Sequence, residues 1–175
     1  TATMIKFVET KRNRDYEIGG YKVTSLRSNH ATEDPDEDTR LYLIEEDGRI
    51  LYYGCDSAWI PTVSWNVIRE KPVNAMVLEL TCGETAAYDW RIFEHNTLPM
   101  IRMMVSVMRT KDAFAEDAKL VLVHLAPSLH KSHAETEVIA ADYAAISAIL
   151  HNALEEDRAE AENMDKNRET ADRIY

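Results

Sequence analysis

Three residues able to bind a metal or move a proton stand where candidate strands end. His30, Asp56 and His124 each lie at or just after the carboxyl end of such a strand. In layered α/β folds, ligands and catalytic groups gather at that end of the strands. Two imidazoles and one carboxylate also form a normal ligand set for a divalent metal, suiting Zn, Mn or Fe. A structural interpretation is also open. In it, both histidines are structural residues with their hydrogen bonds satisfied within the fold, and Asp56 caps a turn.

The strands that would position these residues are marked by alternation, turns and apolar runs. Alternating residues follow the Gly19-Gly20 turn, and Asp47-Gly48 is a strong hairpin signal. Two compact apolar runs are typical of strands covered on both faces. The sequence therefore predicts strands at 21–27, 41–45, 49–53, 76–80 and 120–125.

Helical patterns alternate with the strands. Residues 62–70 follow Pro61, and residues 98–110 follow the candidate caps Asn96-Thr97. The predicted helix at 98–110 carries apolar side chains at helical spacing, which predicts a stripe facing the core. The stripe consists of Met100, Met103, Met104, Val107 and Met108. The three tryptophans are expected to be core or interface anchors: Trp59, Trp65 and Trp90.

From Ala134 onward the pattern is helical. One apolar stripe runs along residues 134–154 at Val138, Ile139, Tyr143, Ile146, Ile149, Leu150 and Leu154. Residues 155–175 hold eight acids and four bases, which predicts a frayed helix or a disordered tail. Strands alternating with helices place the chain in the α/β class.

Charge and composition exclude several classes of function. The 175 residues carry 20 basic and 31 acidic side chains, a net charge of −11. That balance makes nucleic acid an improbable partner, because phosphate contacts need a basic face. No apolar run approaches the roughly 18 residues of a membrane span. Cys55 and Cys82 form no CxxC pair, so we expect a reduced, cytoplasmic chain.

Local sequences around the candidate site residues resemble a known family. A Gly-Gly turn leads through a strand to Asn29-His30; a hairpin then ends in Gly54-Cys55-Asp56-Ser57, and a later strand ends in Leu122-Val123-His124-Leu125. Their order and spacing resemble the second half of a metallo-β-lactamase-fold hydrolase. The likeness is closest to the branch of phosphoribosyl cyclic phosphate phosphodiesterases and tRNA 3′-processing endonucleases. The segment 94–99 looks like the family's Gly-His-rich loop, with Glu94 in place of the usual glycine.

The resemblance implies a role for each matched residue. His30 would ligate one metal, Asp56 would bridge two, and His124 would ligate the second. His95 would lie near the scissile phosphate as a proton donor or phosphate contact; its structural interpretation is a helix-entry residue. The implied chemistry is two-metal hydrolysis of a small or cyclic phosphodiester. His130 and His133 are expected to be exposed loop histidines.

The chain departs from the family in its first half. The hallmark His-x-His-x-Asp-His is missing, because no two of the six histidines are separated by one residue. We therefore expect half of an αββα sandwich, a mixed sheet with flanking helices and a C-terminal helix. The expected divisions are 1–133 for the half-sandwich, 134–154 for an amphipathic helix and 155–175 for the acidic tail.

A half-sandwich would expose an apolar sheet face and a strand edge, which something must cover. The chain could be a piece of a longer hydrolase, or it could pair with a chain carrying the missing N-terminal half. It could also be a half-domain that covers itself with residues 134–154 or forms a homodimer.

Two functions of different class follow. One is a metal-dependent phosphodiester hydrolase; the other is a non-catalytic interaction or dimerisation module using the Met-rich helix or the 134–154 stripe. A generic α/β domain with a coincidental likeness also stays open. Whether His30, Asp56 and His124 converge on a metal discriminates between them.

Overall fold

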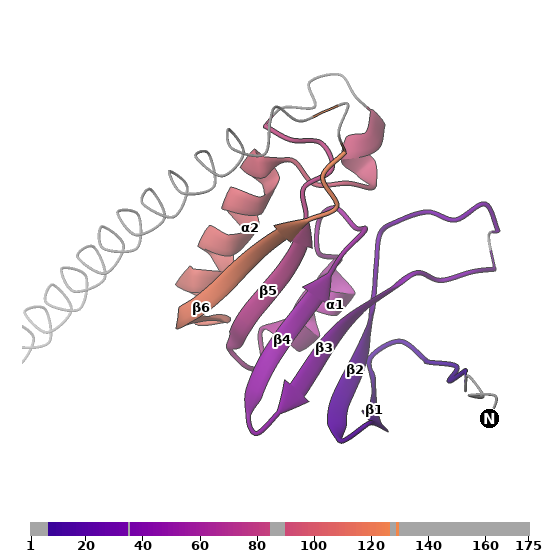
Figure 1. The fold of residues 1–175 in the computed structure, drawn as a ribbon, viewed down its shortest axis with the longest axis vertical. Helices are drawn as coiled ribbons and strands as arrows, with labels where there is room; N and C mark the ends of the chain where they lie inside the picture. Colours follow the sequence, from indigo (N-terminus) through magenta and orange to yellow (C-terminus); the bar gives the residue numbers. More distant parts are fainter. Residues whose placement is uncertain (1–6, 35, 85–89, 127–128, 130–175) are drawn as a thin grey trace, which may run out of the picture.

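The computed structural model describes residues 7–34, 36–84, 90–126 and 129. Six strands in this part of the chain form one sheet whose spatial order equals chain order (Figure 1). The elements in sequence are β1 (Arg14–Ile18), β2 (Tyr21–Arg27), β3 (Arg40–Glu46), β4 (Arg49–Gly54), α1 (Thr62–Ile68), β5 (Val73–Glu79), the 3₁₀ turn η1 (Trp90–Phe93), α2 (Leu98–Thr110) and β6 (Phe114–Val123).

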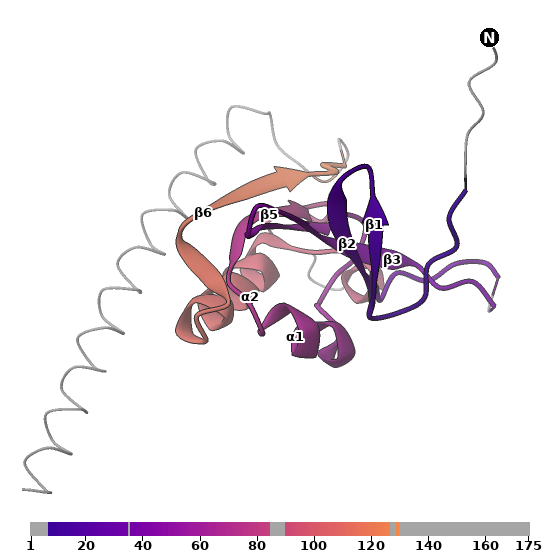
Figure 2. The ribbon, with the colours of Figure 1, turned by 90° about the horizontal axis from the view of Figure 1, so that it is seen from below.

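The sheet is mixed because two kinds of connection join its strands. Strands β1 to β4 pair antiparallel, whereas β4, β5 and β6 pair in parallel. Parallel neighbours need a crossover, which α1 and α2 provide. Two successive crossovers of the same handedness place their helices on the same face of the sheet. Figure 2 shows both α1 and α2 against one face. The predicted α/β class is confirmed.

The core lies between this face and the two helices. Tyr52, Met76 and Leu78 point toward the helices and are at most 1% exposed. They meet Ile101 and Met108 of α2, which are equally buried. Because successive side chains of a strand alternate between faces, their sequence neighbours point the other way.

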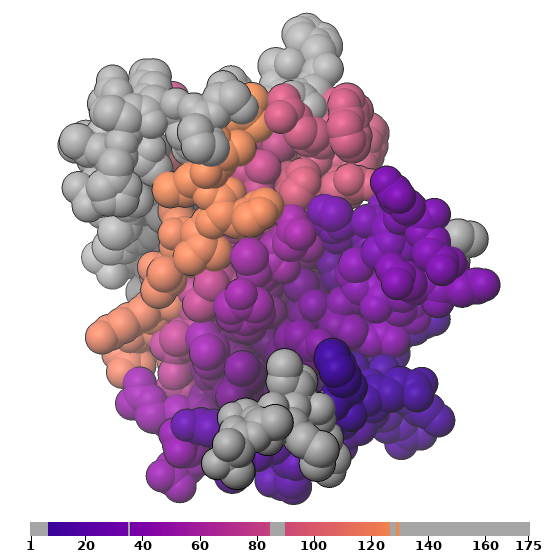
Figure 3. All heavy atoms as spheres, turned by 45° about the vertical axis from the view of Figure 1, so that its right-hand side comes forward, coloured from indigo at the N-terminus to yellow at the C-terminus, as the bar shows by residue number. Residues whose placement is uncertain are grey.

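The opposite face of the sheet is apolar and carries no helix in the part of the chain that the structure describes. Tyr42 stands opposite Tyr53, and Val77 stands opposite both Tyr53 and Val121. Tyr53 is 42% and Val121 47% exposed. Figure 3 shows the atoms of β6, in orange, beside those of the purple strands at the surface. We call this surface the open face.

Several element boundaries follow the prediction closely. The strand at 21–27 and the helix at 98–110 have the predicted bounds, while the helix predicted at 62–70 ends at Ile68. The helix at 98–110 begins as expected, with the Thr97 side chain accepting a hydrogen bond from the Met100 amide. The divisions 134–154 and 155–175 lie outside the described residues.

Three strands were not predicted in full; one of them, β5, was predicted at 76–80 and runs from Val73 to Glu79. The prediction omitted β1, whose five residues are mostly exposed and therefore show no apolar alternation. Strand β6 begins at Phe114 rather than at 120. Its first half was missed because it carries the exposed residues Glu116 and Asp117, which interrupt the apolar pattern. This half pairs with β5 at Phe114 and Lys119, and an irregularity in the register lies between these two pairs.

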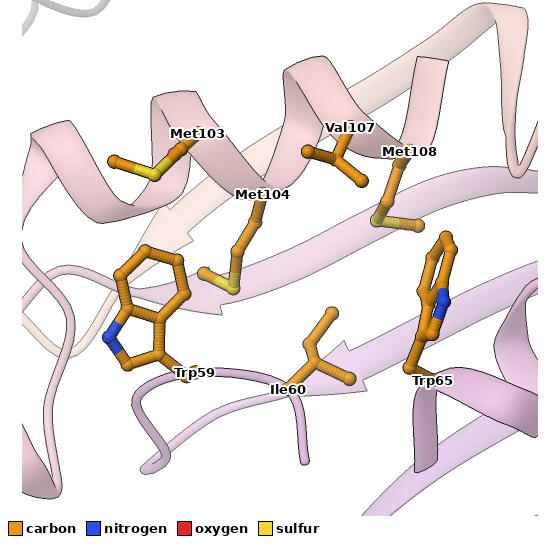
Figure 4. Close-up of a pocket in the computed structure, with 7 residues that line it drawn as sticks. All are labelled: Trp59, Ile60, Trp65, Met103, Met104, Val107 and Met108. Atoms are coloured by element: carbon orange, nitrogen blue, oxygen red, sulfur yellow. The ribbon is translucent and has the colours of Figure 1, made fainter. Parts of the chain in front are cut away.

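The methionine stripe of α2 is only partly core. Met100, Met104 and Met108 are buried, but Met103 is 58% and Val107 49% exposed. These exposed side chains line an apolar groove of about 240 Å³ together with Met104, Met108, Trp59, Ile60 and Trp65 (Figure 4). Among the described residues, no helix is long and apolar enough to cross a membrane.

Candidate metal centre

His30 is held by the loop that follows β2. Its Nδ1 lies 2.7 Å from the Ala31 carbonyl oxygen, so Nδ1 carries the proton that the carbonyl accepts. Ser28 Oγ accepts a hydrogen bond from the His30 amide at 3.0 Å. The ring is thereby fixed in the tautomer that leaves Nε2 without a proton, the usual arrangement of a metal-binding histidine. Nε2 lies 3.4 Å from Asp56 Oδ1.

Asp56 occupies the centre of the site. It follows β4 with a φ of 60°, a left-handed conformation that Asp tolerates better than most residues. Its Oδ1 lies within 4 Å of nitrogens from three histidines: His30, His95 and His124. The preceding Cys55 is half-buried, and burial raises the pKa of its thiol.

His95 enters from the loop between η1 and α2. Its side chain is 13% exposed, and its Nδ1 lies 3.5 Å from both Asp56 Oδ1 and Glu79 Oε1. Nδ1 is buried and makes no hydrogen bond among the described residues. A buried polar atom without a partner is unfavourable in a folded protein, so this nitrogen is a candidate for binding something else.

His124 follows β6 and also adopts a left-handed φ, of 54°. Its Nδ1 is 2.8 Å from Thr81 Oγ1 and 3.8 Å from Asp56 Oδ1. The imidazole is 47% exposed, which leaves one side of the ring open to a ligand. The four residues proposed from the sequence are therefore brought together from the ends of β2, β4 and β6 and from the entry to α2.

A buried carboxylate beneath the site was not predicted. Glu79 ends β5 and is fully buried. Its Oε2 accepts hydrogen bonds from the Thr81 amide, at 2.7 Å, and from the Thr81 hydroxyl; Oε1 accepts one from the Asn96 amide at 2.5 Å. A signal for it does exist in the sequence, because Glu79 is the one charged residue in the apolar run 75–80. An acid at the end of a buried strand needs partners there.

Among the described residues, two overlapping groups of three side chains have donor atoms close enough together to bind a divalent cation. Metal–nitrogen and metal–oxygen bonds of about 2.0–2.2 Å in a tetrahedral site place neighbouring donors about 3.3 Å apart. Asp56 Oδ1 is 3.4 Å from His30 Nε2 and 3.5 Å from His95 Nδ1. Donor atoms of Asp56, His95 and His124 all lie within 4.8 Å of one another. The same holds for His30, Glu94 and His95. His130, His133 and His151 lie outside the described residues.

The comparisons with known proteins concern the fold. No protein-family model matches the sequence, and no curated protein matches it. Among solved structures, the metallo-β-lactamase fold protein YhfI from Bacillus subtilis superposes with a TM-score of 0.53 at 14% identity, covering 75% of this chain and 47% of that one. This chain has that fold. It spans about half the length of YhfI.

Two further structures are similar at lower scores. A diphosphatase of the PhnP family has a TM-score of 0.46 at 14% identity, covering 67% of this chain and 37% of that one. The E377D mutant of the β-hydroxylase CmlA has a TM-score of 0.45 at 14% identity, covering 67% and 32%.

Proposed function

We propose that this chain is part of a metal-dependent phosphodiester hydrolase whose substrate is a small or cyclic phosphodiester. The observation that carries the proposal is the convergence of His30, His95 and His124 on one oxygen of Asp56. Three imidazoles and a carboxylate from separate loops have no structural need to meet at a surface. His30, His124 and Asp56 are a normal donor set for Zn or Mn, and also for Fe.

Each residue has a distinct part in the proposed chemistry. His30 and His124 would each bind a cation, and Asp56, whose Oδ1 lies within 4 Å of both rings, would be shared by the two cations. When bound, two cations stabilise negative charge on the attacking and leaving oxygens of a phosphodiester. His95 contacts the phosphate or gives a proton to the leaving oxygen. Glu79 Oε1 lies 3.5 Å from His95 Nδ1, beneath the site.

A complete centre needs further ligands, which we propose are carried by a second layer packed on the open face. Tyr53 and Val121 on that face are nearly half exposed, and the sheet ends directly at the site. A layer covering the face would bury these side chains and bring its own edge to Asp56. We propose that the N-terminal half of the fold, carried by a longer form of this protein or by another chain, takes that position.

The first test is metal content. We expect about one or two divalent cations per chain in protein purified without chelators or a histidine tag, measured by elemental mass spectrometry. Asp56→Asn removes the central charge and should abolish this binding with little loss of fold. Asp47→Asn is the matched control, because Asp47 has a similar left-handed φ of 49° and lies in the turn that precedes β4, at the end of this strand opposite to Asp56. Equal metal content in the Asp56→Asn and Asp47→Asn proteins would contradict the bridging role.

The alternative function, a non-catalytic module that forms a homodimer, is favoured by a different observation. The open face presents apolar side chains over several strands, an arrangement that monomers in water rarely leave uncovered. Sedimentation at micromolar concentration tests it. A metal-free dimer that Val121→Lys dissociates would favour the module, whereas a metal-loaded monomer would exclude it.

A further inference from the structure

The residues that directly follow or precede the site residues are hydrogen-bonded to one another. Asn29 precedes His30, Ser57 follows Asp56, and Asn96 follows His95. Each is therefore about 3.8 Å along the chain from the neighbouring site residue. We call the three residues the polar clamp.

Asn29 and Ser57 form the first half of the clamp. Asn29 Oδ1 accepts hydrogen bonds from the Ser57 hydroxyl at 2.7 Å and from the Ala58 amide at 2.8 Å. Ser57 Oγ in turn lies 3.4 Å from the Asn29 amide, which donates to it. Three hydrogen bonds thus join the loop carrying His30 to the loop carrying Asp56. All three involve residues no more than two positions from His30 or Asp56.

Asn96 joins the third loop. Its Nδ2 donates to the Ser57 carbonyl at 2.8 Å, and the Asn29 side-chain amide donates to the Phe93 carbonyl at 3.3 Å. Asn96 is fully buried and Ser57 is 1% exposed, so water does not compete for the hydrogen bond between these two residues. Each buried side chain would be costly to leave unpaired, which keeps the three loops in one arrangement.

We propose that Asn29, Ser57 and Asn96 are positioning residues that set the separation of His30, Asp56 and His95. Part of this inference rests on the proposed function, because its consequence for metal affinity requires that the site bind a cation. A site of this kind works only when its donors are held within about 0.5 Å of the binding geometry. The 3.4 and 3.5 Å separations around Asp56 Oδ1 are then a product of the clamp.

Ser57→Ala tests the proposal by removing the hydroxyl alone. Ser57→Thr keeps the hydroxyl and should therefore behave like the unmodified chain. The matched control is Ser64→Ala, because Ser64 is also fully buried and its hydroxyl donates to a backbone carbonyl, that of Arg27 at the end of β2, at 2.7 Å. A second variant, Asn29→Ala, removes three side-chain contacts and should have the larger effect.

Two measurements separate positioning from general stability. Titration with Co²⁺, followed by its visible absorption, should show affinity weakened about 10- to 100-fold in Ser57→Ala. Affinity in Ser57→Thr and Ser64→Ala should stay close to that of the unmodified chain. In the metal-free protein, ring protons of His30 and His95, whose ring centroids are 5.0 Å apart, should give an NOE that Ser57→Ala and Asn29→Ala lose.

The outcomes are distinguishable. Retention of both the NOE and the Co²⁺ affinity in Ser57→Ala and Asn29→Ala would overturn the clamp. Equal losses in Ser57→Ala and Ser64→Ala would also overturn it, because the effect would then reflect any lost buried hydroxyl. If the unmodified chain binds no Co²⁺, the proposed function fails, and the NOE pattern alone decides whether the clamp holds the rings together.

Discussion

Replacing Glu79 by Gln should destabilise the fold strongly, although the shape of the side chain is kept. Glu79 Oε2 accepts hydrogen bonds from the Thr81 amide and the Thr81 hydroxyl. Its other oxygen, Oε1, accepts a hydrogen bond from the Asn96 amide. A glutamine has one carbonyl oxygen. In either orientation its NH₂ group must face an N–H donor, leaving at least one buried amide unpaired.

The size of the effect follows from those contacts. A hydrogen bond to a charged group contributes about 1.5–3 kcal/mol, and an unpaired buried donor costs about 1–3 kcal/mol. We therefore expect a loss of about 3–5 kcal/mol in the free energy of unfolding. For a chain of this size that lowers the melting temperature by about 6–20 °C.

Urea unfolding followed by tryptophan fluorescence measures the loss directly. Glu116→Gln is the matched control, because Glu116 is an exposed carboxylate on β6 and should change stability by less than about 0.5 kcal/mol. A buried carboxylate can also be a net burden, in which case an uncharged substitute is neutral or stabilising. If the Glu79→Gln and Glu116→Gln proteins unfold at the same urea concentration, the reasoning from hydrogen bonds is refuted.

Three further predictions follow from individual contacts. In Gly54→Ala, the new Cβ would lie 2.9 Å from Tyr52 Cζ and 3.0 Å from Leu78 Cδ2, so calorimetry should show a loss of about 1–3 kcal/mol; an unchanged melting temperature would contradict this packing. Thr97→Ala removes the acceptor for the Met100 amide and should cost about 1 kcal/mol, whereas Thr97→Ser should retain stability. Because burial raises the pKa of Cys55, its alkylation by iodoacetamide should accelerate only at a higher pH than that of free cysteine; coincident pH profiles would refute this.

Much of the fold could be predicted from local signals. The hairpin at Asp47-Gly48 and the cap at Thr97 act within a few residues, so the strand and helix that they border were predicted closely. Apolar alternation likewise marks the strands that face the core. It gave no sign of β1, whose exposed residues are kept in the sheet by pairing with β2, and that pairing is not a local property.

The candidate site divides in the same way. His30, Asp56 and His124 could be proposed because residue type and position at a strand end are visible in the sequence. Glu79 and the polar clamp were not proposed, since most of their contacts join residues 17 to 64 positions apart. The exposure of Met103 on an apolar helix stripe also depended on where Trp59 and Trp65 lie.

The sequence by itself thus determined the elements and the residue types at their ends, because turn chemistry and periodicity act over short distances. Tertiary structure alone decided that three imidazoles meet at one oxygen of Asp56, and that a carboxylate is buried below them. Strand pairing and the two crossovers bring those chain segments together, and the energy of a buried polar group depends on which neighbours they bring.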